Sequence, residues 1–477
     1  MAQRPLYLTS TLPYVNAEPH IGFALEMVQA DVIARYRRLM GGEVFFNTGT
    51  DEHGQKIFQK AQEEGRDVQA YVDDFASRFG KLKDALGLSY DAFIRTTDPK
   101  HIIAAQEIWK RCEAAGDIYK KTYTGLYCVG DEAFIKESDL VDGKCPNHPT
   151  MTPIEVAEEN YFFRLSAYQE RILKYLSQEG VVVPEWRRQE AIKFVEAGLE
   201  DFSISRVKEK MPWGIPVPGD ESQVMYVWFD ALTNYISTLD WPDESGNFKK
   251  FWIDGETLQL AGKDQVRFQS IMWQAMLMSA AIKTTDKVFY HGFITSGGQK
   301  MSKSLGNVID PMTLVQEYGT DAVRYFLARH VHPFDDSDVT LERFKEAYNA
   351  DLANGIGNLA SRIMTLAQNN LPSPIERPAV ADFPTAYTEA IDAFEFNRAL
   401  EYVWERIQSL DQRINREEPF KLVKTDPEAG MRVIAELATE LYLLVRMLNP
   451  FMPETNEKLK AAILANKKPE NLFPRKD

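Results

Sequence analysis

The chain has 477 residues, and its 44% hydrophobic and 26% charged residues are typical of a globular protein with a large buried core. Its net charge of -15 excludes a broadly basic nucleic-acid-binding coat, although a local basic groove is compatible with it. No apolar run has the length of a membrane span, and the N-terminus lacks a basic segment followed by an apolar one. We therefore expect a cytoplasmic protein without a membrane partner. The cysteines are too few for a disulfide framework, which also fits a reducing compartment.

The N-terminal part of the chain alternates between strand and helix patterns. A strand is predicted at 6–12, and a helix beginning near His20 places apolar residues three and four apart. A second strand is predicted at 44–47, and Asp51 follows it. This order is typical of a doubly wound, Rossmann-like α/β sheet of parallel strands, in which ligands bind beyond the carboxyl ends of the strands. The loops of His20 and Asp51 both fall at those ends.

The pattern changes to short strands and turn signals at 118–218, which predicts a domain inserted into the sheet domain. Strand–helix alternation is expected to resume with a strand over 223–230. After residue 341 apolar residues follow helical stripes, as in a bundle. We therefore expect four segments: the first half of the catalytic domain at 1–117, a connective insertion with a cysteine knuckle at 118–218, the second half at 219–340, and an all-α bundle at 341–477.

The loop from Ser296 to Asn307 is rich in glycine, lysine and serine and follows an apolar strand predicted at 287–293. Its lysines bring compact positive charges and its serines bring hydroxyl donors, a combination that suits a phosphate chain. Taken alone, such a loop would be interpreted as a solvated surface loop. At the other end of the catalytic segment, the start of the helix at His20 offers unpaired amides to an anion, and Gly22 leaves room for a nucleotide.

The sequence Pro19-His20-Ile21-Gly22 together with KMSKS at 300–304 resembles the nucleotide-binding signature of class I aminoacyl-tRNA synthetases. The resemblance implies ATP with Mg²⁺ as the cofactors and a transfer reaction governed by positioning and electrostatics. It implies His20, Lys300 and Lys303 as catalytic residues, and Gly22, Phe23, Ser302, Ser304 and His291 as ATP-binding residues. Phe23 departs from the family, in which this position is normally His or Asn.

The segments at 12–14, 50–54 and 226–231 resemble those of methionyl-tRNA synthetases, and the resemblance covers nearly the whole chain. It implies that Asp51 holds the ammonium group of methionine. It also implies that the methionine side chain is surrounded by Leu12, Tyr14, Trp228, Ala231, Tyr235, Gln269 and Trp273. Polarizable sulfur is favoured beside aromatic rings, which fits this set. Gln269 stands where the family usually has His. The alternative is that these aromatic residues are only core.

Two ligand pairs in the insertion, Cys128 with Asp131 and Cys145 with His148, have the spacing of a zinc knuckle. Relatives generally carry a fourth soft ligand at the position of Asp131, and a carboxylate can also ligate zinc. We therefore expect these four residues to bind Zn²⁺. The alternative is a knuckle that holds by packing without a metal.

The family resemblance implies that the bundle reads the anticodon, with Arg362 pairing with a base or phosphate and Phe420 stacking on a base. Taken alone, these residues would be an ordinary helix face and a buried ring. Asp321 and Arg324 are expected to be structural groups.

The expected activity is methionine–tRNA ligase, with methionine and the initiator and elongator methionine tRNAs as partners, and the chain end near the bundle favours a monomer. The alternatives are another class I synthetase, such as a cysteinyl enzyme, and a catalytically impaired tRNA-binding paralogue.

Overall fold

The computed structural model describes residues 4–130, 133–301, 307–379 and 382–477, which form two compact units. The sheet unit comprises Met1–Pro19, Gly42–Lys81 and Tyr90–His291. The helical unit comprises the remaining ranges, His20–Gly41, Leu82–Ser89 and Gly292–Asp477. None of the helices formed by the described residues has the length and apolarity that a membrane crossing needs. The expected division into four segments stays a prediction.

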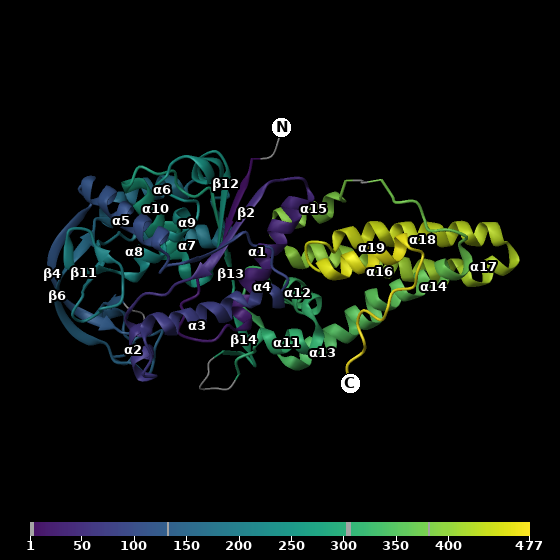
Figure 1. Cartoon of the computed structure of the whole chain (residues 1–477), viewed down its shortest axis with the longest axis horizontal. Helices are drawn as coiled ribbons and strands as arrows, with labels where there is room; N and C mark the ends of the chain where they lie inside the picture. The colour runs from purple at the N-terminus through teal and green to yellow at the C-terminus, as the bar shows by residue number, and fades with distance from the viewer. Residues whose placement is uncertain (1–3, 131–132, 302–306, 380–381) are drawn as a thin grey trace. The chain divides into compact units, whose positions relative to one another are not determined.

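The described strands of the sheet unit include a six-stranded sheet in the order β3-β2-β1-β12-β13-β7, and all neighbouring pairs run parallel (Figure 1). The strands are β1 (Leu6–Thr9), β2 (Val44–Thr50), β3 (Ala92–Arg95), β7 (Val182–Val183), β12 (Glu256–Gly262) and β13 (Lys287–His291). Strand β1 is buried along its length, as expected for a central strand of such a sheet. The chain order reverses between β1 and β12, which makes the carboxyl ends of these strands the expected ligand site. The expected fold class is confirmed.

Two antiparallel sheets form around the expected insertion at 118–218, although β7, from the same range, belongs to the parallel sheet. The larger sheet has the order β5-β4-β6-β8, and a smaller one has the order β10-β11-β9. These strands are β4 (Ile118–Cys128), β5 (Ala133–Ile135), β6 (Ile154–Phe163), β8 (Phe202–Ser203), β9 (Ser205–Val207), β10 (Pro216–Val217) and β11 (Asp220–Met225).

The strand expected over 223–230 is wrong. Strand β11 ends at Met225 in the small antiparallel sheet, and helix α8 (Val227–Ala231) follows after one residue. A short, continuous apolar run fits a buried strand and a buried helical turn equally well, so periodicity cannot distinguish them. This places Trp228 and Ala231 on a helical turn.

The sheet unit contains further helices, namely α2 (Gln55–Glu63), α3 (Val68–Gly80), α5 (Pro99–Ala114), α6 (Gln169–Leu176), α7 (Glu185–Glu196), α9 (Asn234–Ser237) and α10 (Trp273–Ser279). Of these, α5, α6, α7, α9 and α10 contribute side chains to one continuous apolar core. A π-helical turn, η5 (Phe268–Met272), leads directly into α10.

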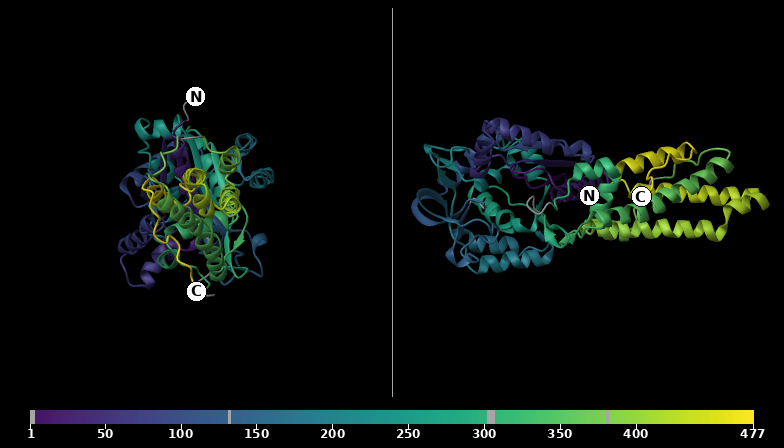
Figure 2. Two further views of the ribbon diagram at one scale, coloured as in Figure 1. Left: turned by 90° about the vertical axis from the view of Figure 1, so that its right-hand side faces the viewer. Right: turned by 90° about the horizontal axis from the view of Figure 1, so that it is seen from below.

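The helical unit contains α1 (Ile21–Leu39) and the bundle, whose helices α14, α16, α18 and α19 run alongside one another in Figures 1 and 2. The helices after the lysine-rich loop are α11 (Pro311–Tyr318), α12 (Thr320–Arg329), α13 (Leu341–Ala347), η7 (Tyr348–Gly357), α14 (Asn358–Asn370), α15 (Thr385–Asp392), α16 (Phe396–Glu417), α17 (Pro419–Thr425), α18 (Pro427–Met447) and α19 (Pro453–Leu464). The apolar stripe of α16 is buried from Phe396 to Ile414. Each such Leu or Ile side chain contributes about 1.5–3 kcal/mol by leaving water.

Candidate active site

His20 caps the N-terminus of α1. Its backbone is extended, and its imidazole Nδ1 accepts a hydrogen bond from the backbone N–H of Gly22 at 3.1 Å. Because Nδ1 accepts, it carries no proton, so the neutral ring presents its proton on Nε2. His20 is exposed, but desolvation by the surrounding protein atoms lowers its pKa below the ordinary value of 6.5, which favours this neutral form. His20 is therefore a hydrogen-bond donor through Nε2 at the N-terminus of α1, where the helix dipole favours an anion. The expectation of unpaired amides there is wrong, because the N–H groups of Ile21, Gly22 and Phe23 all have acceptors within the protein.

Gly22 is needed for this arrangement, since a Cβ atom there would lie 3.0 Å from the His20 ring. The same Cβ would lie 4.0 Å from the Met301 side chain, and the Ile21 N–H donates to the Ile309 carbonyl oxygen at 3.0 Å. The start of α1 thus lies close to Met301 and Ile309. Phe23 donates its N–H back to the His20 carbonyl oxygen in the first turn.

The residues expected to handle phosphate on the lysine-rich loop, Ser302, Lys303 and Ser304, lie outside the described residues, as does the side chain of Lys300. The loop was expected to begin directly after the sheet strand, and this is wrong. A hairpin of β14 (Ile294–Ser296) and β15 (Gln299–Lys300) comes first, and β14 also pairs with β16 (Ser337–Asp338). The hairpin turn has positive φ at both of its glycines, a backbone conformation that other residues rarely adopt. His291, at the end of β13, is buried in the sheet unit.

Asp51 and Tyr14 lie side by side beyond the carboxyl ends of β1 and β2. The Asp51 N–H donates to the Pro13 carbonyl oxygen at 3.0 Å, and the Val15 N–H donates to the Asp51 carbonyl oxygen at 3.1 Å. Asp51 is buried, whereas Leu12 and Tyr14 are half-buried. A carboxylate at this sheet edge suits an ammonium group.

An aromatic group is assembled from α8, α9, η5 and α10. The rings of Tyr235 and Trp273 lie 5.8 Å apart between centroids, and Gln269 Nε2 donates to the Tyr235 hydroxyl. Trp228 stacks on Phe268 at 3.8 Å, and Ala231 follows on the same turn as Trp228. Gln269 Oε1 is buried without a hydrogen-bond partner among the described residues. The pair of Gln269 and Tyr235 is therefore a polar feature in an otherwise apolar wall.

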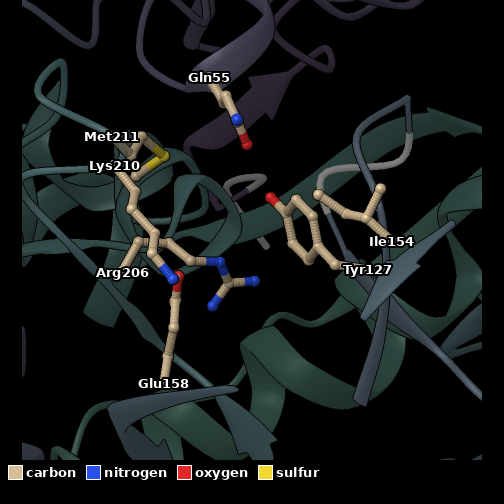
Figure 3. A pocket seen from close by; sticks show the side chains of 7 residues that line it. All are labelled: Gln55, Tyr127, Ile154, Glu158, Arg206, Lys210 and Met211. Carbon is tan, nitrogen blue, oxygen red and sulfur yellow. The ribbon is translucent and has the colours of Figure 1, made fainter. Parts of the chain in front are cut away.

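A separate cavity of about 70 Å³ opens in the sheet unit against the insertion (Figure 3), and its lining contains no residue that was singled out from the sequence. Arg206 lies over the rings of Tyr127 and Tyr226, at 5.2 and 4.5 Å from their centroids. Lys210 pairs with Glu158 at 2.9 Å across the cavity wall (Figure 3). The cavity is therefore lined by charged and aromatic groups.

Three of the four expected metal ligands converge in the knuckle. The donor atoms of Cys128, Cys145 and His148 all lie within 4.8 Å of one another, and His148 Nδ1 lies 3.9 and 3.8 Å from the two sulfur atoms. Tetrahedral zinc with ordinary bond lengths separates sulfur and nitrogen ligands by about 3.5 Å, so this donor set fits zinc. Asp131 lies outside the described residues. Gly130 has no room for a side chain, because a Cβ there would lie 2.5 Å from the His148 ring.

Comparison with known proteins relates the whole chain to one family. The family model described as tRNA synthetases class I (M) matches residues 6–152 and 149–364. The methionine–tRNA ligase of Thermotoga maritima is 42% identical over 484 residues, covering 97% of this chain and 76% of that protein. The chain belongs to the methionyl-tRNA synthetase family. The family and the methionine–tRNA ligase activity expected from the sequence are thereby confirmed.

Further relatives of this methionyl-tRNA synthetase family agree over nearly the whole chain. The methionine–tRNA ligase of Mesorhizobium japonicum is 41% identical, covering 96% of this chain and 91% of that protein. The structure of Mycobacterium tuberculosis methionyl-tRNA synthetase in complex with methionyl-adenylate has a TM-score of 0.89 and 37% identity, covering 100% of this chain and 99% of that one. Its apo form has a TM-score of 0.83 and 34% identity.

The two bundle residues that the synthetase resemblance implies for anticodon reading differ in their surroundings. Phe420 on α17 is 42% exposed, with Lys421 Nζ 5.9 Å from its ring centroid, so it is not the buried ring that its sequence alone would suggest. Arg362 on α14 pairs with Asp411 and donates to the Asn415 side chain at 2.9 Å. Arg362 would therefore have to exchange these partners to contact RNA.

Sequence reasoning missed His53, His101 and Asp230, which form a buried hydrogen-bonded cluster. A signal was present, since Asp230 is an acidic residue within an apolar run, and such a residue is buried only when it is paired. His101 lies about fifty residues from His53, and the sequence around His101 contains no pattern that indicates a functional or buried polar residue.

Proposed function

We propose that this chain activates methionine with ATP and transfers it to methionine tRNA. The carboxylate oxygen of methionine attacks the α-phosphorus of ATP, the bond to the bridging oxygen breaks, and pyrophosphate leaves with that oxygen. A ribose hydroxyl at the end of the tRNA then attacks the carbonyl carbon of the adenylate, and AMP leaves. The observation that carries the proposal is His20, a neutral donor at the N-terminus of α1, where Gly22 lies close to Met301, the second residue of KMSKS.

In the activation step, His20 Nε2–H would donate to a phosphate oxygen as negative charge develops there. Lys300 and Lys303 would offset the charge of the departing pyrophosphate, and Ser302 and Ser304 would donate hydroxyl hydrogen bonds to the phosphates. Gly22, Phe23 and His291 are the further residues proposed to contact ATP. Mg²⁺ bound to the triphosphate would supply additional charge neutralisation.

For the amino acid, we propose that Asp51 pairs with the ammonium group at the edge of the sheet. The thioether would lie among Trp228, Tyr235 and Trp273, with Leu12, Tyr14 and Ala231 completing the wall. Gln269 Nε2 donates to the Tyr235 hydroxyl oxygen, and we propose that Gln269 thereby holds the Tyr235 ring in the wall of the methionine pocket.

Zinc is proposed for the knuckle, with Cys128, Cys145 and His148 as ligands and Asp131 as the fourth. Two thiolates and an imidazole form a donor set typical of structural zinc, which would tie β4 to the segment around His148.

The bundle is proposed to bind the anticodon of initiator and elongator methionine tRNA through Phe420 and Arg362. A cytoplasmic monomer is the proposed state of the protein.

The test is pyrophosphate exchange into ATP, measured with methionine, cysteine, leucine, isoleucine and valine in parallel. We expect exchange that depends on methionine and is at least about a hundredfold slower with each of the others, followed by charging of methionine tRNA. Exchange with cysteine instead would indicate another class I specificity. Binding of methionine tRNA without any exchange would identify a non-catalytic tRNA-binding protein and overturn the proposal.

A further inference from the structure

Asp230 lies between two histidines in the interior of the sheet unit. Its Oδ2 is 2.7 Å from His53 Nδ1, and its Oδ1 is 2.7 Å from His101 Nε2. The second nitrogen of His101, Nδ1, is 3.0 Å from the hydroxyl of Ser237. Asp230, His101 and Ser237 are each 0% exposed, and His53 is 6% exposed. We call His53, Asp230 and His101 the His–Asp–His triad.

The protonation pattern of the triad follows from its geometry. An ionised carboxylate only accepts hydrogen bonds, so both imidazoles must donate to it, His53 through Nδ1 and His101 through Nε2. Burial raises the pKa of Asp230, but His53 and His101 outweigh burial and hold the pKa below its ordinary value. A carboxylate in this site without both partners would be strongly unfavourable, because it has no access to water.

The triad joins segments on both sides of the candidate methionine pocket. His53 follows Asp51 by two residues, in the segment beyond β2. Asp230 lies on α8 between Trp228 and Ala231, which belong to the aromatic wall.

Further contacts hold each end of the triad. The ring of His53 packs against Trp213, 5.6 Å between centroids, and Trp213 Nε1 donates to the Glu52 carbonyl oxygen at 2.6 Å. At the other end, His101 on α5 contacts Ser237, two residues beyond Tyr235 on α9. The Asp230 carboxylate therefore connects the segment of Asp51 with helices α8 and α9, which carry Trp228 and Tyr235.

We propose that Asp230, with His53 and His101, is a positioning residue. It sets the distance between Asp51, which would bind the ammonium group, and the residues that would surround the thioether, Trp228 and Ala231 among them. It thereby sets the affinity for methionine. The triad does not touch the reacting atoms, so its loss acts through Asp51, Trp228 and Ala231. The inference rests on the proposed function, since it assigns these three residues to methionine. It predicts that methionine binding weakens while ATP binding does not.

The experiment is steady-state pyrophosphate exchange by Asp230→Asn, with thermal unfolding measured in parallel. The amide keeps the shape but offers one acceptor oxygen in place of two, so one imidazole must change its tautomer or lose its partner. We expect the KM for methionine to rise about tenfold or more, equivalent to about 1.4 kcal/mol, and the KM for ATP to stay within about twofold. Asp286→Asn is the matched control. Asp286 accepts a hydrogen bond from the Thr257 N–H at 2.9 Å, at the amino ends of the strands and therefore away from the candidate site at their carboxyl ends. It should leave both KM values unchanged.

Two further variants cover the case in which Asp230→Asn does not fold. His101→Ala should raise the KM for methionine, and His101→Gln should restore it in part, since its amide N–H can donate to Asp230. A folded Asp230→Asn or His101→Ala variant with an unchanged KM for methionine would overturn the inference, as would equal rises in both KM values. Absence of methionine-dependent exchange in the unsubstituted protein would instead overturn the proposed function.

Discussion

Arg324 and Asp31 form a fully buried ion pair in the helical unit, with Arg324 Nη1 2.8 Å from Asp31 Oδ2. Arg324 also donates to the carbonyl oxygens of Leu86 at 3.0 Å, Pro450 at 2.8 Å and Phe451 at 2.9 Å. One guanidinium thus joins α1, the segment before residue 90, and the turn between α18 and α19. Its five N–H groups in a planar fork make this possible, whereas a lysine could not reach all four acceptors.

Replacing Arg324 by Met should lower the free energy of unfolding by about 3–5 kcal/mol, because Asp31 and the carbonyl groups lose their donor in the interior. Burial raises the pKa of Asp31, but Arg324 and Arg35 outweigh burial and hold it below its ordinary value of 3.8, so the carboxylate stays ionised. Urea unfolding followed by circular dichroism measures the effect. The double variant with Asp31→Asn should recover part of the loss, and a loss below about 1 kcal/mol in the single variant would contradict this account.

The activity should be insensitive to pH near the ordinary pKa of histidine. Because desolvation by neighbouring atoms lowers the pKa of His20, its neutral form, which accepts from Gly22 and donates through Nε2, persists as the pH falls to 6.5. The cap is lost only when the pH falls through the lowered pKa. Exchange rates measured at saturating substrates from about pH 8 to 6.5 should show no titration of His20. A titration at or above pH 6.5 that disappears in His20→Asn would show that His20 acts in its charged form.

Much of the fold followed from periodicity, and the departures have local physical causes. The helix at His20 and the bundle stripe of α16 repeat their apolar pattern over many residues, so their type was predictable. The run before Asp230 is short and apolar throughout, so a helical turn was mistaken for a strand. The hairpin at 294–300 was missed because its strands are only three and two residues long.

The candidate site was predictable where a motif carries its own chemistry, as in the cysteine knuckle. The His–Asp–His triad was not, because it depends on side chains that meet only after folding: His53 and Asp230 are separated by 177 residues. The tautomer of His20 also required geometry, since sequence does not show which ring nitrogen accepts from Gly22.

Purified protein should contain about one zinc per chain, as expected for a single knuckle. Cys145→Ser should remove most of the metal and weaken the insertion, because three converging donors become two. Cys112→Ala is the matched control. Cys112 is buried on α5 and is not among the converging donor atoms of the knuckle. Metal analysis by mass spectrometry that finds no zinc in the unsubstituted protein would favour a knuckle held by packing alone.

Phe420→Ala should raise the KM for methionine tRNA in the charging reaction by about tenfold, since stacking of a base on an aromatic ring contributes about 1–3 kcal/mol. Pyrophosphate exchange should not change, because that step needs no tRNA. Ile103→Ala, at an exposed apolar side chain on α5, is the control and should leave both reactions unaffected. An unchanged KM for tRNA in Phe420→Ala would remove Phe420 from the anticodon surface.

The most direct measurement is the rate of methionine-dependent pyrophosphate exchange by Lys303→Ala, compared with Lys458→Ala, whose side chain is 62% exposed on α19. If Lys303 stabilises the departing pyrophosphate, the Lys303 variant should lose about a hundredfold or more in rate, whereas the Lys458 variant keeps the full rate. A rate for Lys303→Ala within about twofold of the unsubstituted protein would contradict the account.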